Sequence, residues 1–337
     1  MRRIVLVLVA INAALLAIGA ALAPARPARG LGRRIHVGLV FDVGGRGDRS
    51  FNDAAARGLE RAAAELGAAV ETIEPGDGGD RETALRQLAA GGADLVIGVG
   101  FIFSNDLDRL AADFPNTRFA GIDYSPTPGR AIAPNLLALT FREHEAAFVV
   151  GAIAGLVTRS HTVGFVGGMK IPLIRKFEAG YTAGVHHECP GCTVLAIYAG
   201  SEPKAFADPT RGRELASAQY DRGADIIFHA AGKTGDGVFA AARDRHLLAI
   251  GVDSDQYDQA PCCIVASMVK RVDVTVYDEV RAVLEGRFTG GVRELGLAED
   301  GVGFVARDDE LLPPAVRRRA EQLAADVIAG RITVPSQ

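Results

Sequence analysis

Asp42-Val-Gly-Gly-Arg-Gly-Asp-Arg-Ser-Phe-Asn52 lies between an apolar run, residues 35–41, and a segment whose apolar residues have helical spacing, residues 50–66. Polar turns recur along the chain, most of them where an apolar run ends and a helical segment begins. They include Phe119-Ala-Gly-Ile-Asp-Tyr124, Phe165-Val-Gly-Gly-Met169, His229-Ala-Ala-Gly232, Ile250-Gly-Val-Asp-Ser-Asp255 and Ser267-Met-Val-Lys270. In an open α/β sheet, strand carboxyl ends and helix N-termini form the crevice where ligands bind. The turns therefore predict a site that holds one small polar ligand with an aromatic face.

Apolar runs of strand length alternate with helical segments in two successive series, which meet near residue 141. Continuous apolar strands between helices indicate parallel strands that are buried on both faces. We predict an α/β fold of two similar lobes joined by a hinge. Lobe 1 is expected to comprise residues 34–141 and about 270–288, and lobe 2 residues 142–266 and about 292–337. A chain that visits both lobes and then returns is suited to hinge closure around a ligand.

Composition narrows the classes of function. The chain has 337 residues, 48% of them hydrophobic, which is enough for two α/β domains. The net charge of −4 and the pI near 6.0 argue against a nucleic-acid binder, which would normally show a basic face. Tryptophan is absent and aromatic residues make up 6%, so no platform for stacking single-stranded bases is evident.

Residues 1–30 differ from the rest of the chain. Arg2 and Arg3 precede an apolar run, residues 4–23, and the run is followed by small residues and prolines. This order is typical of an export signal. The run is also close to the roughly 20 residues that span a bilayer, so residues 1–30 are expected to be a signal peptide or an uncleaved N-terminal anchor. No lipid-acceptor cysteine is present there. Both alternatives place the body outside the cytoplasm, in the periplasm or on the outer face of the cell membrane.

The four cysteines form two close pairs. Cys189 and Cys192 lie in a Cys-Pro-Gly-Cys loop, and an oxidising compartment favours a disulfide between them. Free thiols, a redox site and half of a metal site are the alternatives. The redox reading is weakened because the motif follows a helical segment and precedes a strand, which is the reverse of a thioredoxin-like site. Cys262 and Cys263 are expected to be either a buried strand pair or a bonded vicinal pair.

Six segments, read in order, resemble the basic membrane protein family. They are Asp42-Val-Gly-Gly with Asp48 and Ser50-Phe-Asn52, Gly164-Phe-Val-Gly-Gly-Met169, Phe177-Glu-Ala-Gly-Tyr181, Tyr220-Asp with Gly223-Ala-Asp225 and His229-Ala-Ala-Gly232, Gly251-Val-Asp-Ser-Asp-Gln256, and Ser267-Met-Val-Lys270. The family comprises substrate-binding proteins of ABC importers with the type I periplasmic binding protein fold, and characterised members bind purine nucleosides. The resemblance extends from about residue 34 to about residue 284. It therefore implies a purine nucleoside ligand and a permease and ATPase complex as partner.

The resemblance also implies the ligand-binding residues, which are Asp42, Phe51, Asn52, Asp123, Phe206, Gly232, Asp253 and Lys270. Phe51 and Phe206 are expected to sandwich a purine ring, since aromatic pairs contribute roughly 0.5–1.5 kcal/mol beyond area burial. Asp123 and Asn52 are expected to pair with the edge of the ring, and Asp253 to accept ribose hydroxyls, with Lys270 or Asp42 at the remaining hydroxyl. Three acids with one lysine favour a nucleoside or sugar over a nucleotide.

Each of these residues has a structural alternative. The three aspartates can be ordinary caps of the helices that follow them, the phenylalanines can be core or loop anchors, and Lys270 can be a surface charge. Catalytic motifs are lacking, because no nucleophile is paired with a base, and no cofactor or metal is expected. The sequence therefore favours a solute receptor over an enzyme. A sensor of the same fold that signals to a membrane protein, and a receptor for another ribose-like solute, are the alternatives.

Overall fold

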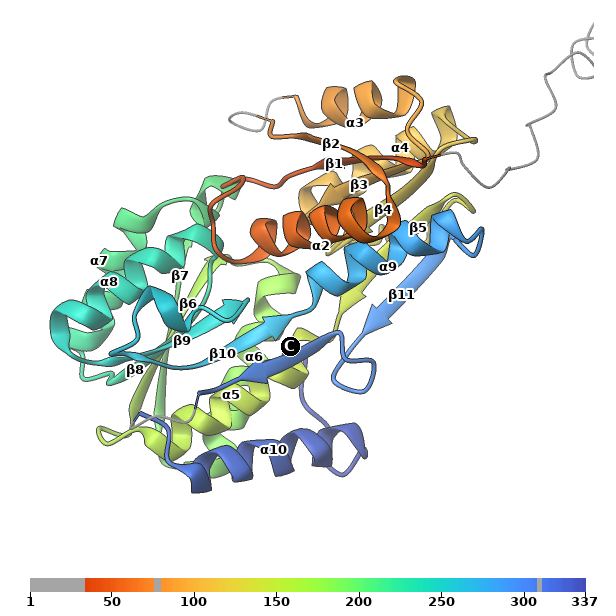
Figure 1. Ribbon diagram of the computed structural model, residues 1–337. Helices are drawn as coiled ribbons and strands as arrows, with labels where there is room; N and C mark the ends of the chain where they lie inside the picture. Colours follow the sequence, from red (N-terminus) through yellow and green to blue (C-terminus); the bar gives the residue numbers. More distant parts are fainter. Residues whose placement is uncertain (1–33, 76–79, 308–310) are drawn as a thin grey trace, which may run out of the picture. The chain divides into compact units, whose positions relative to one another are not determined.

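The computed structural model describes residues 34–75, 80–307 and 311–337. The predicted signal peptide or anchor, residues 1–30, lies outside the described residues. From residue 35 onward the chain forms two six-stranded sheets with helices packed against them (Figure 1). In the part of the chain that is described, none of the helices is both long and apolar enough to cross a membrane.

The first sheet has the strand order β11-β5-β4-β3-β1-β2, and all its neighbouring strands are parallel. Its strands are β1 (His36–Val40), β2 (Ala69–Ile73), β3 (Leu95–Val99), β4 (Arg118–Ile122), β5 (Leu136–Phe141) and β11 (Gly291–Leu295). The helices of this lobe are α2 (Phe51–Leu66), α3 (Arg81–Ala90), α4 (Ser104–Asp113) and α9 (Val272–Leu284). Helix α9 packs along α2, although more than 200 residues separate them in the chain.

The second sheet has the order β12-β10-β9-β8-β6-β7. Its strands are β6 (Thr162–Met169), β7 (Thr193–Gly200), β8 (Ile226–Ala230), β9 (Leu248–Asp253), β10 (Ile264–Lys270) and β12 (Val302–Val305), and only the pairing of β12 with β10 is antiparallel. Its helices are α5 (Glu143–Val157), α6 (Pro172–Glu188), α7 (Pro209–Asp221), α8 (Gly235–Arg245) and α10 (Pro314–Ile328). The predicted α/β fold of two similar, mostly parallel lobes is therefore confirmed.

Burial explains why these segments form strands and close-packed helices. Every residue of β3 and of β8 is buried, as expected for parallel strands covered by helices on both sides. Helices α5 and α6 pack so closely that a Cβ atom on Gly184 would lie 1.9 Å from the carbonyl oxygen of Phe148. A glycine at this position therefore sets how near the two helices can lie.

One strand differs from the sequence-based assignment. The segment from about residue 292 was expected in lobe 2, whereas β11 pairs in parallel with β5 in the first sheet. The chain re-enters the second sheet only at β12. Three segments of the described chain thus pass between the lobes, at Arg142, at Arg271 and at residues 296–301. β11 was missed because its residues are not an apolar run: as an edge strand it alternates between half-buried and exposed residues.

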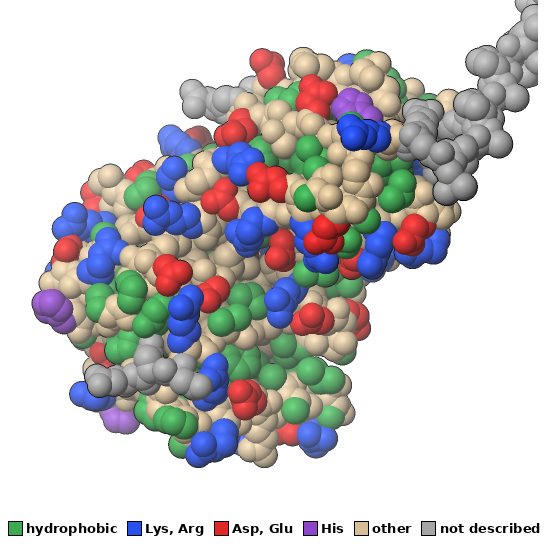
Figure 2. All heavy atoms as spheres, viewed as in Figure 1, with side chains coloured by type: hydrophobic (Ala, Val, Ile, Leu, Met, Phe, Trp, Pro, Cys, Tyr) green, Lys and Arg blue, Asp and Glu red, His purple; other side chains and the backbone are tan. Residues whose placement is uncertain are grey.

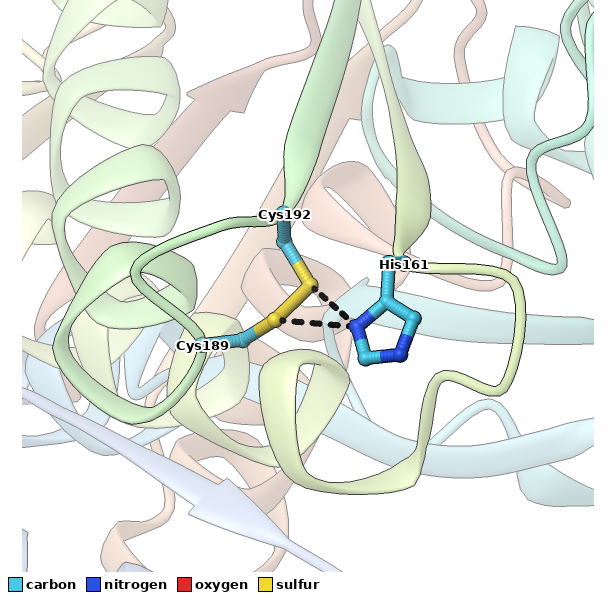
Figure 3. Close-up of side chains that lie close together, drawn as sticks. All are labelled: His161, Cys189 and Cys192. Carbon is cyan, nitrogen blue, oxygen red and sulfur yellow. Dashed lines mark hydrogen bonds between the residues drawn. A yellow bond between two sulfur atoms is a disulfide. The ribbon is translucent and has the colours of Figure 1, made fainter.

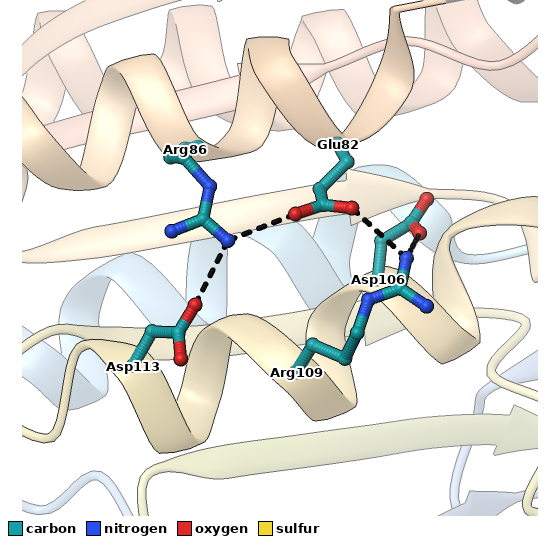
Figure 4. A network of polar contacts seen from close by, with 5 residues as sticks. All are labelled: Glu82, Arg86, Asp106, Arg109 and Asp113. Carbon is teal, nitrogen blue, oxygen red and sulfur yellow. Dashed lines mark hydrogen bonds and ion pairs between the residues drawn. The ribbon is translucent and has the colours of Figure 1, made fainter.

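Exposed charges on the first lobe form a network between α3 and α4. Arg86 contacts Glu82 and Asp113, and Arg109 contacts Glu82 and Asp106 (Figure 4). Exposed pairs of this kind contribute little to stability because solvent screens them, so the network ties two surface helices together without dominating stability. Figure 2 shows basic and acidic side chains interspersed over the face that it presents.

Candidate functional site

One cavity lies between the two sheets, at the carboxyl ends of their parallel strands. All eight residues expected to bind ligand line it, namely Asp42, Phe51, Asn52, Asp123, Phe206, Gly232, Asp253 and Lys270. Asp42 and Asp123 follow strands of the first sheet, whereas Asp253 and Lys270 end strands of the second. The structure therefore brings the predicted set together from both lobes, and their contact with a ligand stays a prediction.

Lys270 is the cation of the cavity wall and is almost fully buried, with 2% of its side chain exposed. Its Nζ donates to both carboxylate oxygens of Asp123, each at 2.8 Å, and lies 3.2 Å from Glu143. Burial opposes the charge, but the nearby acids outweigh this effect and raise the pKa of Lys270. The structural alternative of a surface charge at this position is therefore excluded: Lys270 is a buried cation held by two acids.

Three aromatic rings surround this ammonium group. Nζ lies 5.3, 5.1 and 5.4 Å from the ring centroids of Phe51, Phe141 and Phe177. A cation over the face of an aromatic ring gains about 0.5–2 kcal/mol, more when it is desolvated. Phe51 therefore contributes to two features, the cavity wall and the setting of Lys270.

Asp48 organises the entrance to α2. Its carboxylate accepts hydrogen bonds from the backbone N–H groups of Ser50, Asn52 and Asp53, at 2.9, 2.8 and 3.1 Å. It also accepts one from the Asn52 side chain at 3.0 Å, while the Asn52 Oδ1 accepts from the backbone N–H of Asp42 at 2.9 Å. The amide of Asn52 thus holds the loop in place, and one N–H of its Nδ2 remains for a ligand.

Burial changes the acidity of two cavity aspartates. It raises the pKa of Asp42 to about 7, against the backbone N–H of Val43, which favours the charged form. It raises the pKa of Asp253 to about 6, although Lys270 and a 2.8 Å hydrogen bond from the Ser50 hydroxyl favour the carboxylate. Both carboxyls therefore change protonation near neutral pH, where a donor from a ligand can hold them charged.

Two of the cavity aspartates have an unusual backbone conformation. Asp123 and Asp253 both adopt the left-handed region, with φ of 57° and 62°. Aspartate reaches this region more readily than most residues, but the conformation still costs about 1 kcal/mol or more and is common at ligand sites. Neither residue is an ordinary helix cap: the element after Asp123 is strand β5, and the 3₁₀ turn after Asp253, Tyr257–Gln259, is preceded by Gln256 as its N-cap.

Phe206 lies on the second-lobe side of the cavity, in a short 3₁₀ turn, Pro203–Phe206. Its ring packs directly on the backbone of Gly168, where a Cβ atom would lie 2.2 Å from the ring. It also meets Phe101 edge to face, with centroids 6.3 Å apart. Gly168 lies within strand β6, so a glycine is needed here for the close approach of the Phe206 ring and not for a turn.

Several cavity residues were not among those expected. Asp48, Phe101 and Phe177 line the cavity, and Glu143 holds Lys270 from the first turn of α5. Phe101 follows the apolar strand β3, so the strand-end rule that identified Asp42 and Asp123 could have found it. Glu143 also follows a strand, β5, but an acid at the start of a helix is common and does not by itself indicate a site.

Both cysteine pairs are disulfides in the structure. Cys189 is bonded to Cys192 in the loop between α6 and β7, and Cys262 is bonded to Cys263 before β10. Two histidines, His186 and His187, lie at the end of α6 close to this loop. The ring of His186 contacts the carbonyl oxygen of Cys192 at 3.2 Å, and the ring of His187 packs on Phe148. Neither histidine bonds to a cysteine sulfur.

Comparison with known proteins places the chain in a family. A family model described as ABC transporter substrate-binding protein PnrA-like matches residues 35–337. The CD4+ T-cell-stimulating antigen of Listeria monocytogenes is 33% identical, with 89% of this chain and 88% of that protein covered. Basic membrane protein D of Borreliella burgdorferi is 32% identical, with 89% and 87% covered. A solved solute-binding protein of an ABC transporter system from Aeropyrum pernix is 31% identical, with a TM-score of 0.82, and 90% and 94% of the two chains are covered.

The fold and the cavity between its sheets define a solute-binding protein of the type I periplasmic class. More particularly, the chain belongs to the basic membrane protein family of ABC transporter substrate-binding proteins. The resemblance on which the site residues rested is thereby confirmed. Membership implies a small solute as ligand and a permease and ATPase complex as partners, in an extracytoplasmic setting.

Proposed function

We propose that the protein binds a purine nucleoside in the cavity between its lobes and delivers it to an ABC permease at the outer face of the cell membrane. One observation carries this proposal: a single cavity combines aromatic rings with hydrogen-bonding acids, and both lobes supply members of each kind. A nucleoside needs both kinds of group, because it has an apolar ring with two faces and a sugar with several hydroxyl donors.

The aromatic groups suit the base. Phe51 from the first lobe and Phe206 from the second line the same cavity, and Phe101 borders Phe206. Flat rings from opposite lobes can contact the two faces of a purine, and the remaining N–H of Asn52 can pair with an acceptor on its edge. The base would therefore be enclosed only when both lobes contact it.

The acids suit the sugar. Asp253 and Asp42 are acceptors when ionised, and neutral hydroxyl groups of a ribose are the donors that such carboxylates bind strongly. Because burial raises the pKa of both groups, a donor placed against them also offsets the cost of ionising them. A pair of ribose hydroxyls fits Asp253, whose carboxylate accepts one bond from Ser50 and keeps further acceptor sites free.

Charge argues against a nucleotide. Four acids line the cavity (Asp42, Asp48, Asp123 and Asp253), and its cation, Lys270, is already bonded to Asp123 and lies beside Glu143. A phosphate would meet an excess of negative charge without a free cation among the cavity residues. We therefore expect the nucleoside, and not its phosphate ester, to be the ligand.

A calorimetric screen tests the proposal. Residues 34–337 would be titrated with purine nucleosides, pyrimidine nucleosides, free bases, pentoses and nucleoside monophosphates. Purine nucleosides should bind most tightly, and monophosphates at least about tenfold more weakly, which corresponds to 1.4 kcal/mol. Tightest binding of a free pentose would overturn the nucleoside assignment in favour of a sugar receptor. Chromatography of the recovered ligand should return intact nucleoside, and free base formed in proportion to protein would indicate an enzyme.

A further inference from the structure

His161, Cys189 and Cys192 meet at the amino ends of β6 and β7 (Figure 3). The Nδ1 atom of His161 lies 3.6 Å from the sulfur of Cys189 and 3.8 Å from that of Cys192. The cavity lies at the other end of the same strands, so this cluster is separate from the proposed nucleoside site.

The sheet register brings these residues together. Thr162 pairs with Thr193 in the parallel ladder of β6 and β7, which places the preceding residues, His161 and Cys192, beside each other. The backbone N–H of Thr193 donates to the carbonyl oxygen of His161 at 2.8 Å, and this bond locks the two loops together. The position of the His161 backbone beside Cys192 therefore follows from strand pairing and does not depend on the disulfide.

Hydrogen bonds to Asp225 also fix the loop that carries His161. The carboxylate of Asp225 accepts hydrogen bonds from the Thr158 hydroxyl and from the backbone N–H groups of Arg159 and Ser160, at 2.7, 2.6 and 2.8 Å. His161 then takes a left-handed conformation, with φ of 57°. A side chain held on so rigid a turn can serve as a metal ligand with little ordering cost.

The two nitrogen–sulfur distances match those between ligands of a tetrahedral metal ion, whereas the two sulfurs are bonded to each other and separate only on reduction. With a metal–sulfur distance of about 2.3 Å and a metal–nitrogen distance of about 2.0 Å, a sulfur and a nitrogen on one tetrahedral ion lie about 3.5 Å apart. Both sulfurs already lie near this separation from the His161 nitrogen. The Cys-x-x-Cys spacing is the one found in structural zinc sites, and sulfur with imidazole nitrogen selects zinc over the hard cations.

We propose that reduction of the Cys189–Cys192 disulfide turns this cluster into a Zn²⁺ site with His161 as its third ligand. A dithiol supplies two electrons and two protons to the sulfur–sulfur bond and becomes a disulfide itself. The two thiols that form release their protons when Zn²⁺ binds, because the thiolate is the ligand. Water takes the fourth position, since His161 is exposed and the loop residues Pro190 and Gly191 are exposed as well.

The test uses Co²⁺ as a probe of a tetrahedral sulfur site. The full chain with Cys262→Ser and Cys263→Ser, which keeps only the two cysteines in question, is reduced with a trialkylphosphine, freed of reductant without oxygen and titrated with Co²⁺. The phosphine reduces the disulfide and becomes a phosphine oxide, whose oxygen comes from water. Because this reductant is not a thiol, it leaves no competing sulfur ligand for the metal. The unsubstituted protein is measured in parallel. The reduced chain should bind one Co²⁺ with a tetrahedral absorption spectrum that Zn²⁺ abolishes, and the oxidised chain should not.

Two histidine variants assign the third ligand. His161→Asn keeps the left-handed turn, because asparagine tolerates it, and should weaken Co²⁺ binding by at least about tenfold, as losses around metal sites commonly do. His186→Asn, on the nearby end of α6, should leave the spectrum and affinity unchanged. The proposal is overturned if the reduced unsubstituted chain shows no tetrahedral spectrum, or if His161→Asn binds as tightly as its parent. Neither outcome bears on nucleoside binding, which is measured at the opposite end of the strands.

Discussion

At the scale of the residue, the cavity acids are set apart by their surroundings and not by their type. Asp42 and Asp253 have pKa values raised by burial, and Asp123 and Asp253 hold left-handed backbone conformations at strand ends. The same residue types on exposed helices, such as Asp113 and Glu82, belong to a solvated charge network. An acid at the end of a buried strand is therefore a candidate for ligand binding, whereas an acid on an exposed helix is not.

Asp42 should make the stability of the protein depend on pH. Its folded-state pKa of about 7 lies above its ordinary value of 3.8, so the folded state binds more protons than the unfolded state between these pH values. The free energy of unfolding must then fall as the pH rises through this window. Asp42→Asn removes the contribution and should flatten the decrease between pH 4 and pH 7, measured by urea unfolding without ligand. The exposed Glu214→Gln serves as control, and an unaltered slope in Asp42→Asn would contradict the prediction.

Phe51 and Phe206 should each contribute to nucleoside affinity. Replacing either with alanine removes stacking and buried area, so binding should weaken by about 1–3 kcal/mol in calorimetric titration. Phe304→Ala provides a matched control, because Phe304 is also half-buried but does not line the cavity. If both cavity variants retain the parent affinity, the sandwich is wrong.

Asp253 should discriminate between sugars. Asp253→Asn preserves the left-handed backbone but replaces a carboxylate by a weaker acceptor. The variant should lose more affinity for ribonucleosides than for the corresponding deoxyribonucleosides, so the gap between the two classes narrows in paired titrations. Equal losses for both classes would mean that this acid does not read the ribose hydroxyls.

At the scale of the element, the charged group at the end of β10 joins three segments of the fold. Lys270 is the last residue of β10, immediately before the chain passes to α9 in the first lobe; Asp123 follows β4, and Glu143 begins α5. Two of the three connections between the lobes therefore start or end at this group. An ion pair buried in such a place fixes how the connecting segments meet.

Lys270→Met should be strongly destabilising. The change leaves the buried carboxylate of Asp123 without its bonded cation and leaves Glu143 with Lys176 alone. Loss of one partner of a buried pair costs about 3–5 kcal/mol. Denaturant unfolding should show this loss, and adding Asp123→Asn and Glu143→Gln should restore part of it. Lys176→Met removes a more exposed partner of Glu143 and should cost less. If Lys270→Met alone is as stable as the parent, the buried ion pair does not stabilise the fold.

At the scale of the whole molecule, ligand should stabilise the form in which the lobes are closed. The cavity residues come from both sheets, so one ligand can contact all of them only when the lobes approach each other. Nucleoside at a hundredfold excess over Kd should raise stability by about 2.7 kcal/mol. Solution scattering and melting curves with and without nucleoside measure compaction and stabilisation together, and a pentose provides the control. No change in either measurement would exclude the nucleoside as ligand.

The sequence determined the local elements, the fold class and the family. A buried parallel strand such as β3 is a continuous apolar run, and the turns that follow such strands carry the acids and aromatics, so both could be recognised without coordinates. The eight candidate residues could be named because the family resemblance supplied their order along the chain.

Only the tertiary structure decided which residues from distant parts of the chain lie in contact. The pairing of β11 with the first sheet, the contact of Lys270 with Glu143 and the approach of His161 to the cysteine loop join segments that are far apart in sequence. No local pattern encodes such contacts, because they depend on strand register and on the packing of one lobe against the other. The altered pKa values of Asp42 and Asp253 arise in the same way, since burial belongs to the folded chain and not to the residue.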